Sequence, residues 1–545
     1  MSTSEPTSTP SSGGTPLWVI GDDGRPVLRV GEEDPEMIRV LTRALDGRII
    51  PGSYVADGAP VVLEEISGAA GPVAADDDAA LPITASTLKP SLFAALLAEH
   101  ATVMGAKNGK PAEVTPAGPV LSAVLARRSW RGLPVLNGII STPVLRPDGT
   151  LLQRPGYDPD TGFYLASNTH LAPIPDKPTP DQVAEAREFL LDTFLRDFPW
   201  RTPADKANYM ALLATPLIRP YTRALSPFGL VEASMPGSGK TILTGCVGLL
   251  VGQTVQNWTE SEDELRKTIT SVLAEPSGVI VFDNIKEGTA LDSATLARLM
   301  TERSWSDRKL GTNTAPTYTN DRLWLATGNN LRTGGDMASR TVWVRLDPDC
   351  PRPEARSGFT IPNLDSWILE PKNRAIVLRH LLVLILDWTN HGAPEASGTI
   401  PQMRQFTAWA KHLGGFLEHH GIGHFLANSE SVRGLDEDNA EWMNFLHTWH
   451  ELHGDRRLSA QELRQSGEPT AGTDPWAGTF PTDRTGKPLS ARSLGKRLTG
   501  HIDRWHTDIV LRSVIDSHHN CRTYWTEPFQ PDTDDDMTEN RDNEA

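Results

Sequence analysis

The sequence is poor in cysteine and has no long apolar run. Among 545 residues there are only three cysteines, and Cys246, Cys350 and Cys521 lie far apart without C-x-x-C spacing. This spacing excludes a cysteine zinc ribbon and indicates a reducing compartment. The most apolar segment, 375–388, contains charged residues and is shorter than the ~20 residues that a membrane-spanning helix requires. We therefore expect a core helix there and no membrane partner.

A signal peptide and an excess of positive charge are also absent. Residues 1–16 are rich in Ser, Thr, Pro and Gly, which predicts a disordered leader on a cytoplasmic protein. The 69 acidic residues outnumber the 52 Lys and Arg, so the net charge is −17. Part of this surplus lies in an acidic tail at 529–545, which we expect to be disordered. The balance argues against a uniformly basic nucleic-acid-binding surface but allows a local basic channel.

A phosphate-binding loop stands between two apolar runs in the middle of the chain. Residues 231–241 read Val-Glu-Ala-Ser-Met-Pro-Gly-Ser-Gly-Lys-Thr. In the pattern G-x-x-x-x-G-K-[ST], backbone N–H groups cradle phosphates, Lys240 reaches the β- and γ-phosphates, and Thr241 ligates Mg²⁺. Ser234 stands where the pattern has its first glycine. The expected contacts to ATP come from Pro236, Gly237, Ser238, Gly239, Lys240, Thr241 and Ile242.

A second apolar run ends in an acidic residue. Residues 278–285 read Gly-Val-Ile-Val-Phe-Asp-Asn-Ile, and the predicted strand places Asp283 at the carboxyl edge of a parallel sheet, beside the Mg²⁺. The next residue is Asn284, where a second acidic residue is expected. Either Asn284 positions the attacking water by hydrogen bonding, or Glu287 or Glu232 supplies the carboxylate.

A third predicted strand, at 323–327, runs into Gly328-Asn329-Asn330. This arrangement places the Asn329 amide where it can contact the γ-phosphate or the lytic water. For an isolated Asn-Asn pair a turn is the simpler interpretation, but the two preceding strands favour a site residue. The sequence thus predicts an α/β fold with a parallel sheet, in which Lys240, Asp283 and Asn329 meet at one edge.

The spacing of these three residues resembles the AAA+ core of superfamily 3 helicases. Four further segments resemble the helicase part of primase-helicases encoded by phages, plasmids and integrative elements, particularly in actinobacteria. They read Ser-Asp-Arg-Lys-Leu-Gly (306–311), Ala-Thr-Gly-Asn-Asn-Leu (326–331), Gly-Asp-Met-Ala-Ser-Arg (335–340) and Arg-Pro-Glu-Ala-Arg-Ser-Gly-Phe (352–359). The resemblance covers about 133–525. Since no acidic primase triad or zinc-binding cysteines precede this region, we expect the helicase half alone, with a separate primase or polymerase as a partner.

The resemblance implies an arginine that acts across a subunit boundary. In hexameric ATPases of this type, a neighbouring subunit inserts an arginine that neutralises the charge developing on the γ-phosphate. Arg340 is our candidate, and Arg332 and Arg345 are weaker ones. The alternative interpretation for each is a surface ion pair.

The resemblance also implies a hairpin in the interval 305–322 that lines a central pore. Arg308 and Lys309 lie in this interval, and their charges would bind the nucleic-acid backbone without reading sequence. The other interpretation is that both residues contact nucleotide or a neighbouring subunit. Arg308 could then act as a second arginine in trans.

The segment 441–528 predicts a winged-helix domain. Two short helices with Ser caps precede two wing strands, at 458–464, 490–498, 510–514 and 522–525. Near the second helix, which enters the major groove in DNA-binding members, we expect a cluster of Arg492, Lys496, Arg497 and Arg504. Winged helices also bind proteins, so both interpretations stay open.

Adjacent histidines occur twice, at His419-His420 and His518-His519. Neither pair has Cys or Asp at metal-ligand spacing, so we expect ordinary surface residues. The predicted domain boundaries are a leader at 1–16, an N-terminal accessory region of unknown role at 17–132, a β-meander with a helical lead-in at 133–220, an AAA+ P-loop core at 221–395, a helical linker or lid at 396–440, the winged-helix-like domain at 441–528 and the tail at 529–545.

Together these features predict an ATP-hydrolysing ring, expected to be a hexamer, that acts as a helicase or translocase on single-stranded or forked DNA during replication of a mobile element or phage. Two alternatives remain. The first is a DNA-independent NTPase switch of a defence or regulatory type, which Asn284 favours by suggesting slow turnover. The second is a DNA-binding initiator with a weak ATPase. The expected catalytic residues are Lys240, Asp283, Asn284, Asn329 and Arg340, and the expected Mg²⁺ ligands are Thr241 and Asp283.

Overall fold

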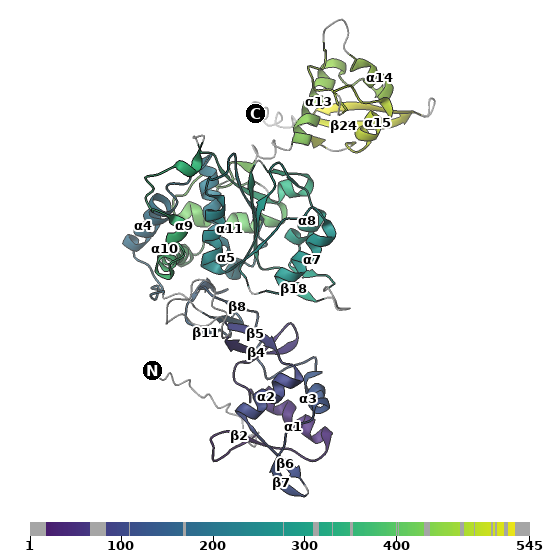
Figure 1. Ribbon diagram of the computed structural model, residues 1–545. Helices are drawn as coiled ribbons and strands as arrows, with labels where there is room; N and C mark the ends of the chain where they lie inside the picture. The colour runs from purple at the N-terminus through teal and green to yellow at the C-terminus, as the bar shows by residue number, and fades with distance from the viewer. Residues whose placement is uncertain are drawn as a thin grey trace, which may run out of the picture. The chain divides into compact units, whose positions relative to one another are not determined.

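The computed structural model describes residues 18–65, 83–107, 109–166, 171–275, 277–308, 316–329, 331–348, 352–398, 400–401, 403–429, 437–468, 474–483, 486–502, 505–506, 509–516 and 521–528. The expected leader and acidic tail, Lys309, Arg504, and His518-His519 lie outside these residues. The chain divides into two compact units: residues 1–331 with 339–428, and residues 332–338 with 429–545. Figure 1 shows the helices and strands of the two units.

The N-terminal region contains two small sheets and three helices. One sheet has the order β1-β2-β6-β7 and the other β3-β4-β5. The strands are β1 (Val19–Ile20), β2 (Pro26–Arg29), β3 (Ser53–Ala56), β4 (Ala59–Glu65), β5 (Ile83–Thr87), β6 (Thr102–Lys107) and β7 (Lys110–Glu113). The helices are α1 (Asp34–Asp46), α2 (Pro90–His100) and α3 (Gly118–Leu125). Leu41, Phe93 and Val124, one from each helix, are buried in one apolar core with Leu28 of β2.

The segment predicted as a β-meander has a different topology. Its strands are β8 (Gly138–Ile140), β9 (Val144–Leu145), β10 (Leu151–Leu152), β11 (Gly156–Tyr157) and β12 (Phe163–Leu165). The predicted turns at 146–149 and 158–162 join antiparallel pairs, β9 with β10 and β11 with β12. However, β8 pairs in parallel with β12, because Asn137 binds the second turn through its backbone N–H to Gly162 O and its side chain to Thr161 O. A meander requires antiparallel neighbours throughout, so that prediction was wrong for β8.

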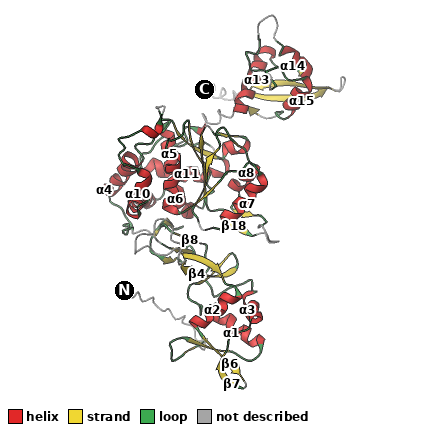
Figure 2. Ribbon diagram, in the orientation of Figure 1, coloured by secondary structure: helices red, strands yellow, loops and turns green. Residues whose placement is uncertain are grey.

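A five-stranded parallel sheet forms the centre of the first unit, as the sequence predicted. Its order is β14-β15-β19-β13-β21, and all its pairings are parallel. The strands are β13 (Phe228–Ala233), β14 (Gln253–Gln256), β15 (Val279–Ile285), β19 (Leu323–Asn329) and β21 (Thr341–Leu346). Helices α5 and α11 lie on one side of this sheet, and α7 and α8 on the other (Figure 2). Cover on both faces explains why β13, β15, β19 and β21 are largely apolar, whereas the edge strand β14 (Gln-Thr-Val-Gln) is not. The protein is therefore a mixed α/β structure with a sheet consistent with a P-loop core.

The helices of this part are α4 (Pro180–Glu188), α5 (Pro203–Thr222), α6 (Lys240–Val251), α7 (Glu262–Leu273), α8 (Ala294–Thr301), α9 (Leu364–Trp367), α10 (Pro371–Asn390) and α11 (Thr407–His419). Shorter elements are η1 (Phe189–Phe194), β16 (Ala290–Leu291), β17 (Ser304–Ser306), β18 (Thr317–Thr319), β20 (Arg332–Thr333), η2 (Gly335–Ser339), η3 (Pro353–Ala355) and η4 (Arg404–Phe406). The segment predicted as a core helix lies within α10, where Leu381, Leu384 and Trp388 are fully buried. Among the described residues, no helix is both long and apolar enough to span a membrane.

The second unit has a helical and a sheet layer. Its helices are α13 (Glu437–His453), α14 (Ala460–Ser466) and α15 (Ala491–Thr499), and its strands are β22 (Leu458–Ser459), β23 (Trp505–His506), β24 (Ile509–Asp516) and β25 (Cys521–Pro528). The strand order is β22-β25-β24-β23, and β24 and β25 form an antiparallel hairpin. Trp449, Leu463, Leu494 and Leu511 lie in one buried core, so the three helices and the sheet pack together.

Candidate active site

The phosphate-binding loop joins β13 to α6 at the carboxyl edge of the sheet. Residues 236–239 form the loop, and residues 240–242 begin α6. Gly237 and Gly239 have left-handed backbones, with φ of +74° and +95°. A Cβ on Gly239 would lie 3.1 Å from the ring of Phe198, and one on Gly237 would lie 3.2 Å from the backbone nitrogen of Glu354. Both positions therefore require glycine for conformation and for space.

The departure at Ser234 has a local explanation. Ser234 is not among the residues with positive φ, so its backbone has no need of glycine there. Its hydroxyl donates to Asp347 Oδ1 at 2.9 Å. The serine thus anchors the start of the loop to the end of β21 without altering the phosphate-facing glycines.

Lys240 and Asn329 are brought into direct contact. Lys240 Nζ donates to Asn329 Oδ1 at 2.6 Å. The contact arises because β19 lies between β15 and β13, with Asn329 in register with Ala233 at the end of β13. Burial lowers the pKa of Lys240, and the carboxylates of Glu232 and Asp283 partly oppose that effect. The amide therefore holds the lysine at the position where it would meet phosphate.

Asp283 meets Thr241 on the other side of the loop. Thr241 Oγ1 lies 3.5 Å from Asp283 Oδ1, and the same oxygen accepts from Thr327 Oγ1 at 2.5 Å. A threonine hydroxyl beside a carboxylate is the hard oxygen donor set that suits Mg²⁺. The sequence analysis did not identify Thr327. Thr327 lies two residues before Asn329 and therefore on the same face of β19, and this spacing could have indicated that it belongs to the site.

Asn284 follows at a break in the strand. The pairing of β15 with β19 shifts register between Phe282 and Ile285, and Asn284 lies between them with φ of +53°. Its N–H donates to Thr327 Oγ1 at 2.9 Å, and its side chain is exposed. Asparagine tolerates this left-handed conformation better than most residues, which accounts for an amide at this position.

The two carboxylates considered for the lytic water differ in environment. Glu232 is 8% exposed at the end of β13 and stands opposite Arg345 of β21 in register. Glu287 is exposed in the loop that follows β15. Glu232 is also the largest electrostatic contributor that raises the pKa of Lys240, so it belongs to the environment of the phosphate-binding lysine.

The candidate arginines occupy three different environments. Arg345 is 4% exposed and lies 3.7 Å from the buried Asp205, so its assignment as a weaker finger candidate was wrong; its charge is held inside the fold. Arg332 is exposed. Arg340 immediately precedes β21, and its Nη1 donates to Ala297 O of α8 at 2.5 Å.

Arg340 lies at the edge of the sheet opposite the phosphate-binding loop. Its carbonyl accepts from the N–H of Phe228, the first residue of β13, whereas the loop follows the last residue of that strand. At about 3.3 Å per residue, the length of β13 separates the two by roughly 17 Å. An arginine side chain does not span that distance, so Arg340 does not reach the loop of its own chain.

The predicted hairpin is present as β17 and β18, which pair antiparallel from Ser304 with Thr319 to Ser306 with Thr317. Trp305 is fully buried at its base and donates to Thr270 Oγ1 at 3.0 Å. Arg308 is exposed just beyond β17. Lys309 lies outside the described residues.

Helix α15 carries the other predicted nucleic-acid contacts. Arg492, Lys496 and Arg497 are exposed, while Leu494 and Leu498 are buried in the core of the second unit. Within the described part of the chain, none of the three cations forms an ion pair. The helix therefore presents uncompensated positive charge to solvent.

No family model and no curated protein match this chain. Among solved structures it is similar to the C-terminal region of NrS-1 in an apo form, with 10% identity and a TM-score of 0.34 over 81% of this chain and 100% of that chain. A second NrS-1 C-terminal structure, of residues 305–718, gives 9% identity and a TM-score of 0.32 over 77% and 93%. The helicase of JCV gives 16% identity and a TM-score of 0.20 over 46% of this chain and 70% of that chain. These scores are too low to support a functional assignment, which depends on the site geometry instead.

Proposed function

We propose that this chain is an ATP-hydrolysing, AAA+-type helicase or translocase that works as a ring on DNA. The observation that carries the proposal is the contact of Lys240 Nζ with Asn329 Oδ1 at 2.6 Å, beside Thr241 and Asp283. This contact joins the phosphate-binding loop to β19, which lies between β13, the strand before the loop, and β15, the strand that carries Asp283. An amide in contact with the phosphate-binding lysine is suited to detect the γ-phosphate.

The proposed chemistry divides among these residues. Lys240 neutralises the phosphate charge, and Thr241 with Asp283 would hold Mg²⁺, which supplies charge neutralisation and alignment of the phosphates. When Lys240 turns to the γ-phosphate, its bond to Asn329 is exchanged for a charge-assisted bond to phosphate. The freed Asn329 amide then contacts the γ-phosphate or the attacking water. Loss of the γ-phosphate would restore the Lys240–Asn329 contact, so the pair reports the nucleotide state to β19.

The proposed ring rests on Arg340 as an arginine that acts in trans. Since Arg340 lies roughly 17 Å from the loop of its own chain, the arginine that completes this site would come from a neighbouring copy. A hexamer is the expected ring. Hydrolysis would then require assembly, which couples each site to the movement of the next subunit.

Two surfaces would contact DNA. The β17–β18 hairpin carries the exposed Arg308, with Lys309 next in the sequence, and would track the backbone of one strand through the pore. The second unit has the element order α13-β22-α14-α15-β23-β24-β25, which supports a winged helix with α15 as its nucleic-acid helix. Single-stranded or forked DNA, during replication of a mobile element or phage with a separate primase or polymerase, is the proposed setting.

The test is steady-state ATP hydrolysis by the purified chain, with and without single-stranded DNA, with Lys240→Ala as the blank. We expect about tenfold stimulation by DNA, followed by unwinding of a forked substrate. Hydrolysis that is the same with and without DNA would instead support a DNA-independent NTPase switch, which the exposed amide at Asn284 favours. Sequence-specific binding to duplex DNA with barely detectable hydrolysis would support an initiator.

A further inference from the structure

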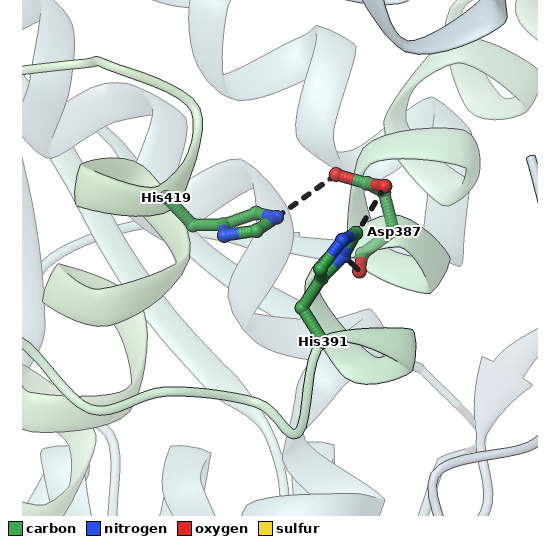
Figure 3. Close-up of side chains that lie close together, drawn as sticks. All are labelled: Asp387, His391 and His419. Carbon is green, nitrogen blue, oxygen red and sulfur yellow. Dashed lines mark hydrogen bonds and ion pairs between the residues drawn. The ribbon is translucent and has the colours of Figure 1, made fainter. Parts of the chain in front are cut away.

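A compact cluster of two histidines and one aspartate joins the ends of α10 and α11 (Figure 3). His419 Nε2 lies 2.9 Å from Asp387 Oδ2, and His391 Nδ1 lies 3.5 Å from Asp387 Oδ1. One ligand atom from each residue lies within 4.8 Å of the other two. The spacing in the chain conceals this cluster, because Asp387 and His419 belong to different helices.

Both helices present their carboxyl ends to the cluster. Asp387 lies in the last turn of α10, His391 is the residue that caps this helix, and His419 is the last residue of α11. The carbonyl groups at a helix C-terminus carry partial negative charge and favour a cation. Two such ends and one carboxylate therefore converge on the same place.

His420 lies beside the cluster, inside the fold. It is 6% exposed, and its Nε2 lies 2.9 Å from the carbonyl oxygen of Leu384. A carbonyl only accepts, so Nε2 carries the hydrogen. Nδ1 lies 3.9 Å from Asp387 Oδ2. His420 is thus not the surface residue that the sequence suggested.

We propose that Asp387, His391 and His419 bind one Zn²⁺-class divalent cation that clamps the ends of α10 and α11. Imidazole nitrogens with one carboxylate select zinc and its first-row neighbours, whereas Mg²⁺ and Ca²⁺ take oxygen ligands. Bonds of about 2.0–2.1 Å at tetrahedral angles separate ligand atoms by about 3.4 Å. The distances of 2.9 Å and 3.5 Å are close to this value but run to different carboxylate oxygens, Oδ2 and Oδ1, so the carboxylate would turn one oxygen towards the ion.

Small movements complete the site. His391 Nδ1 donates to the backbone oxygen of Asp387 at 2.8 Å. The His391 side chain is 61% exposed, and its ring lies 4.9 Å from that of His419, so its free side leaves room for the ring to turn towards the cation. This exposure also provides the path by which the ion enters. Water fills the fourth position.

The experiment uses tag-free full-length protein, stripped with EDTA, dialysed and titrated with Zn²⁺ against a chromophoric chelator in the absence of nucleotide. We expect one equivalent per chain. His391→Ala should weaken binding at least about 100-fold, since even the loss of a supporting contact around a ligand costs 10–100-fold. His100→Ala is the matched control: this histidine also neighbours a carboxylate, Glu99, but belongs to no three-ligand cluster among the residues that the structure describes, and its loss should change nothing.

A second readout separates metal binding from folding. Co²⁺ added to the stripped protein should give the visible absorption of a four-coordinate site, which His391→Ala and Asp387→Asn abolish while far-UV circular dichroism stays the same. Zn²⁺ should raise the melting temperature of the wild-type chain but not of His391→Ala. The proposal is overturned if the wild-type chain takes up no Zn²⁺, or if His391→Ala binds it as tightly. The cluster would then be a hydrogen-bonded cap on two helix ends.

Discussion

The proposed catalytic edge of the sheet and the exposed face of α15 use charge in opposite ways. At the edge, Lys240 is bound to Asn329, and Asp283 accepts from Thr327, so the polar groups are held in place before a ligand arrives. On α15, Arg492, Lys496 and Arg497 lie in solvent without an ion partner among the described residues. Preorganised groups stabilise a transition state, whereas exposed cations attract a polyanion by release of counterions. Substitutions at the edge should therefore alter turnover, and substitutions on α15 should alter affinity and its salt dependence.

The largest effect is expected at the edge. Lys240→Ala should reduce ATP hydrolysis to background, because the change removes both phosphate binding and stabilisation of the transition state. Turnover measured at saturating ATP checks this. Lys267→Ala is the matched control: Lys267 is an exposed lysine of α7, paired with Glu264, and its loss should leave the rate unchanged. A rate in Lys240→Ala within tenfold of wild type would exclude the proposed site.

The next effect concerns the boundary between subunits. Arg340→Ala should lower turnover about 10³-fold while ATP still binds, as for other arginines that act in trans. The change also removes the hydrogen bond to Ala297 O, so loss of activity by itself does not separate the trans role from a local structural role.

Mixing two inactive chains makes that separation. A ring that contains Lys240→Ala and Arg340→Ala chains has some interfaces with an intact loop on one side and an intact arginine on the other. Activity should reappear on mixing, with a maximum near equal proportions. Mixtures that stay as inactive as either chain alone, although the chains assemble, would remove Arg340 from the mechanism.

The meeting of polar residues at this edge was predictable because parallel strands bring their carboxyl ends to one side of a sheet. Lys240, Asp283 and Asn329 each follow an apolar run, and the structure brings their side chains together. The role of Thr327 could not be predicted, because it depends on the position of β19 between β15 and β13. The amide at Asn284 became understandable only from its φ of +53°, since backbone conformation at a register shift is not visible in residue types.

The histidine cluster, in contrast, could not be predicted from the sequence. His419-His420 carries no ligand spacing of its own, because its carboxylate partner, Asp387, is 32 residues before His419 in a separate helix. The parallel pairing of β8 with β12 was missed for the same reason. Local patterns predict strands, turns and caps, whereas contacts between distant segments depend on how the segments pack.

On the α15 side, substituting Arg492, Lys496 and Arg497 together by Ala should weaken binding of single-stranded DNA about 100-fold. The slope of log affinity against log salt should fall by about 2, at ~0.7 per lost phosphate contact. Hydrolysis without DNA should stay the same, since the change does not touch the catalytic edge. Fluorescence anisotropy at several salt concentrations measures both quantities.

The control variant removes the same number of positive charges from another part of the chain. Arg39, Arg43 and Lys110 are exposed cations of the N-terminal region, and their joint replacement by Ala should leave the salt slope unchanged. If both triple variants lose affinity equally, the attraction comes from overall charge and α15 is not a binding surface.

The smallest effect is a pH dependence that tests the burial of Lys240. Burial lowers the pKa of this lysine below its ordinary value of 10.5, and only the protonated form attracts phosphate. ATP affinity should thus be complete at neutral pH and decline several-fold as the pH rises through the lowered pKa, before an exposed lysine would titrate. Lys240→Arg keeps its charge throughout this range, so its weaker affinity should stay flat. ATP affinities measured from pH 7 to 10 distinguish the two. A wild-type profile as flat as that of the arginine variant would mean that Asn329 and the neighbouring carboxylates compensate for the burial of the lysine. Lys240 would then stay protonated over the same pH range as the solvent-exposed Lys496 of α15.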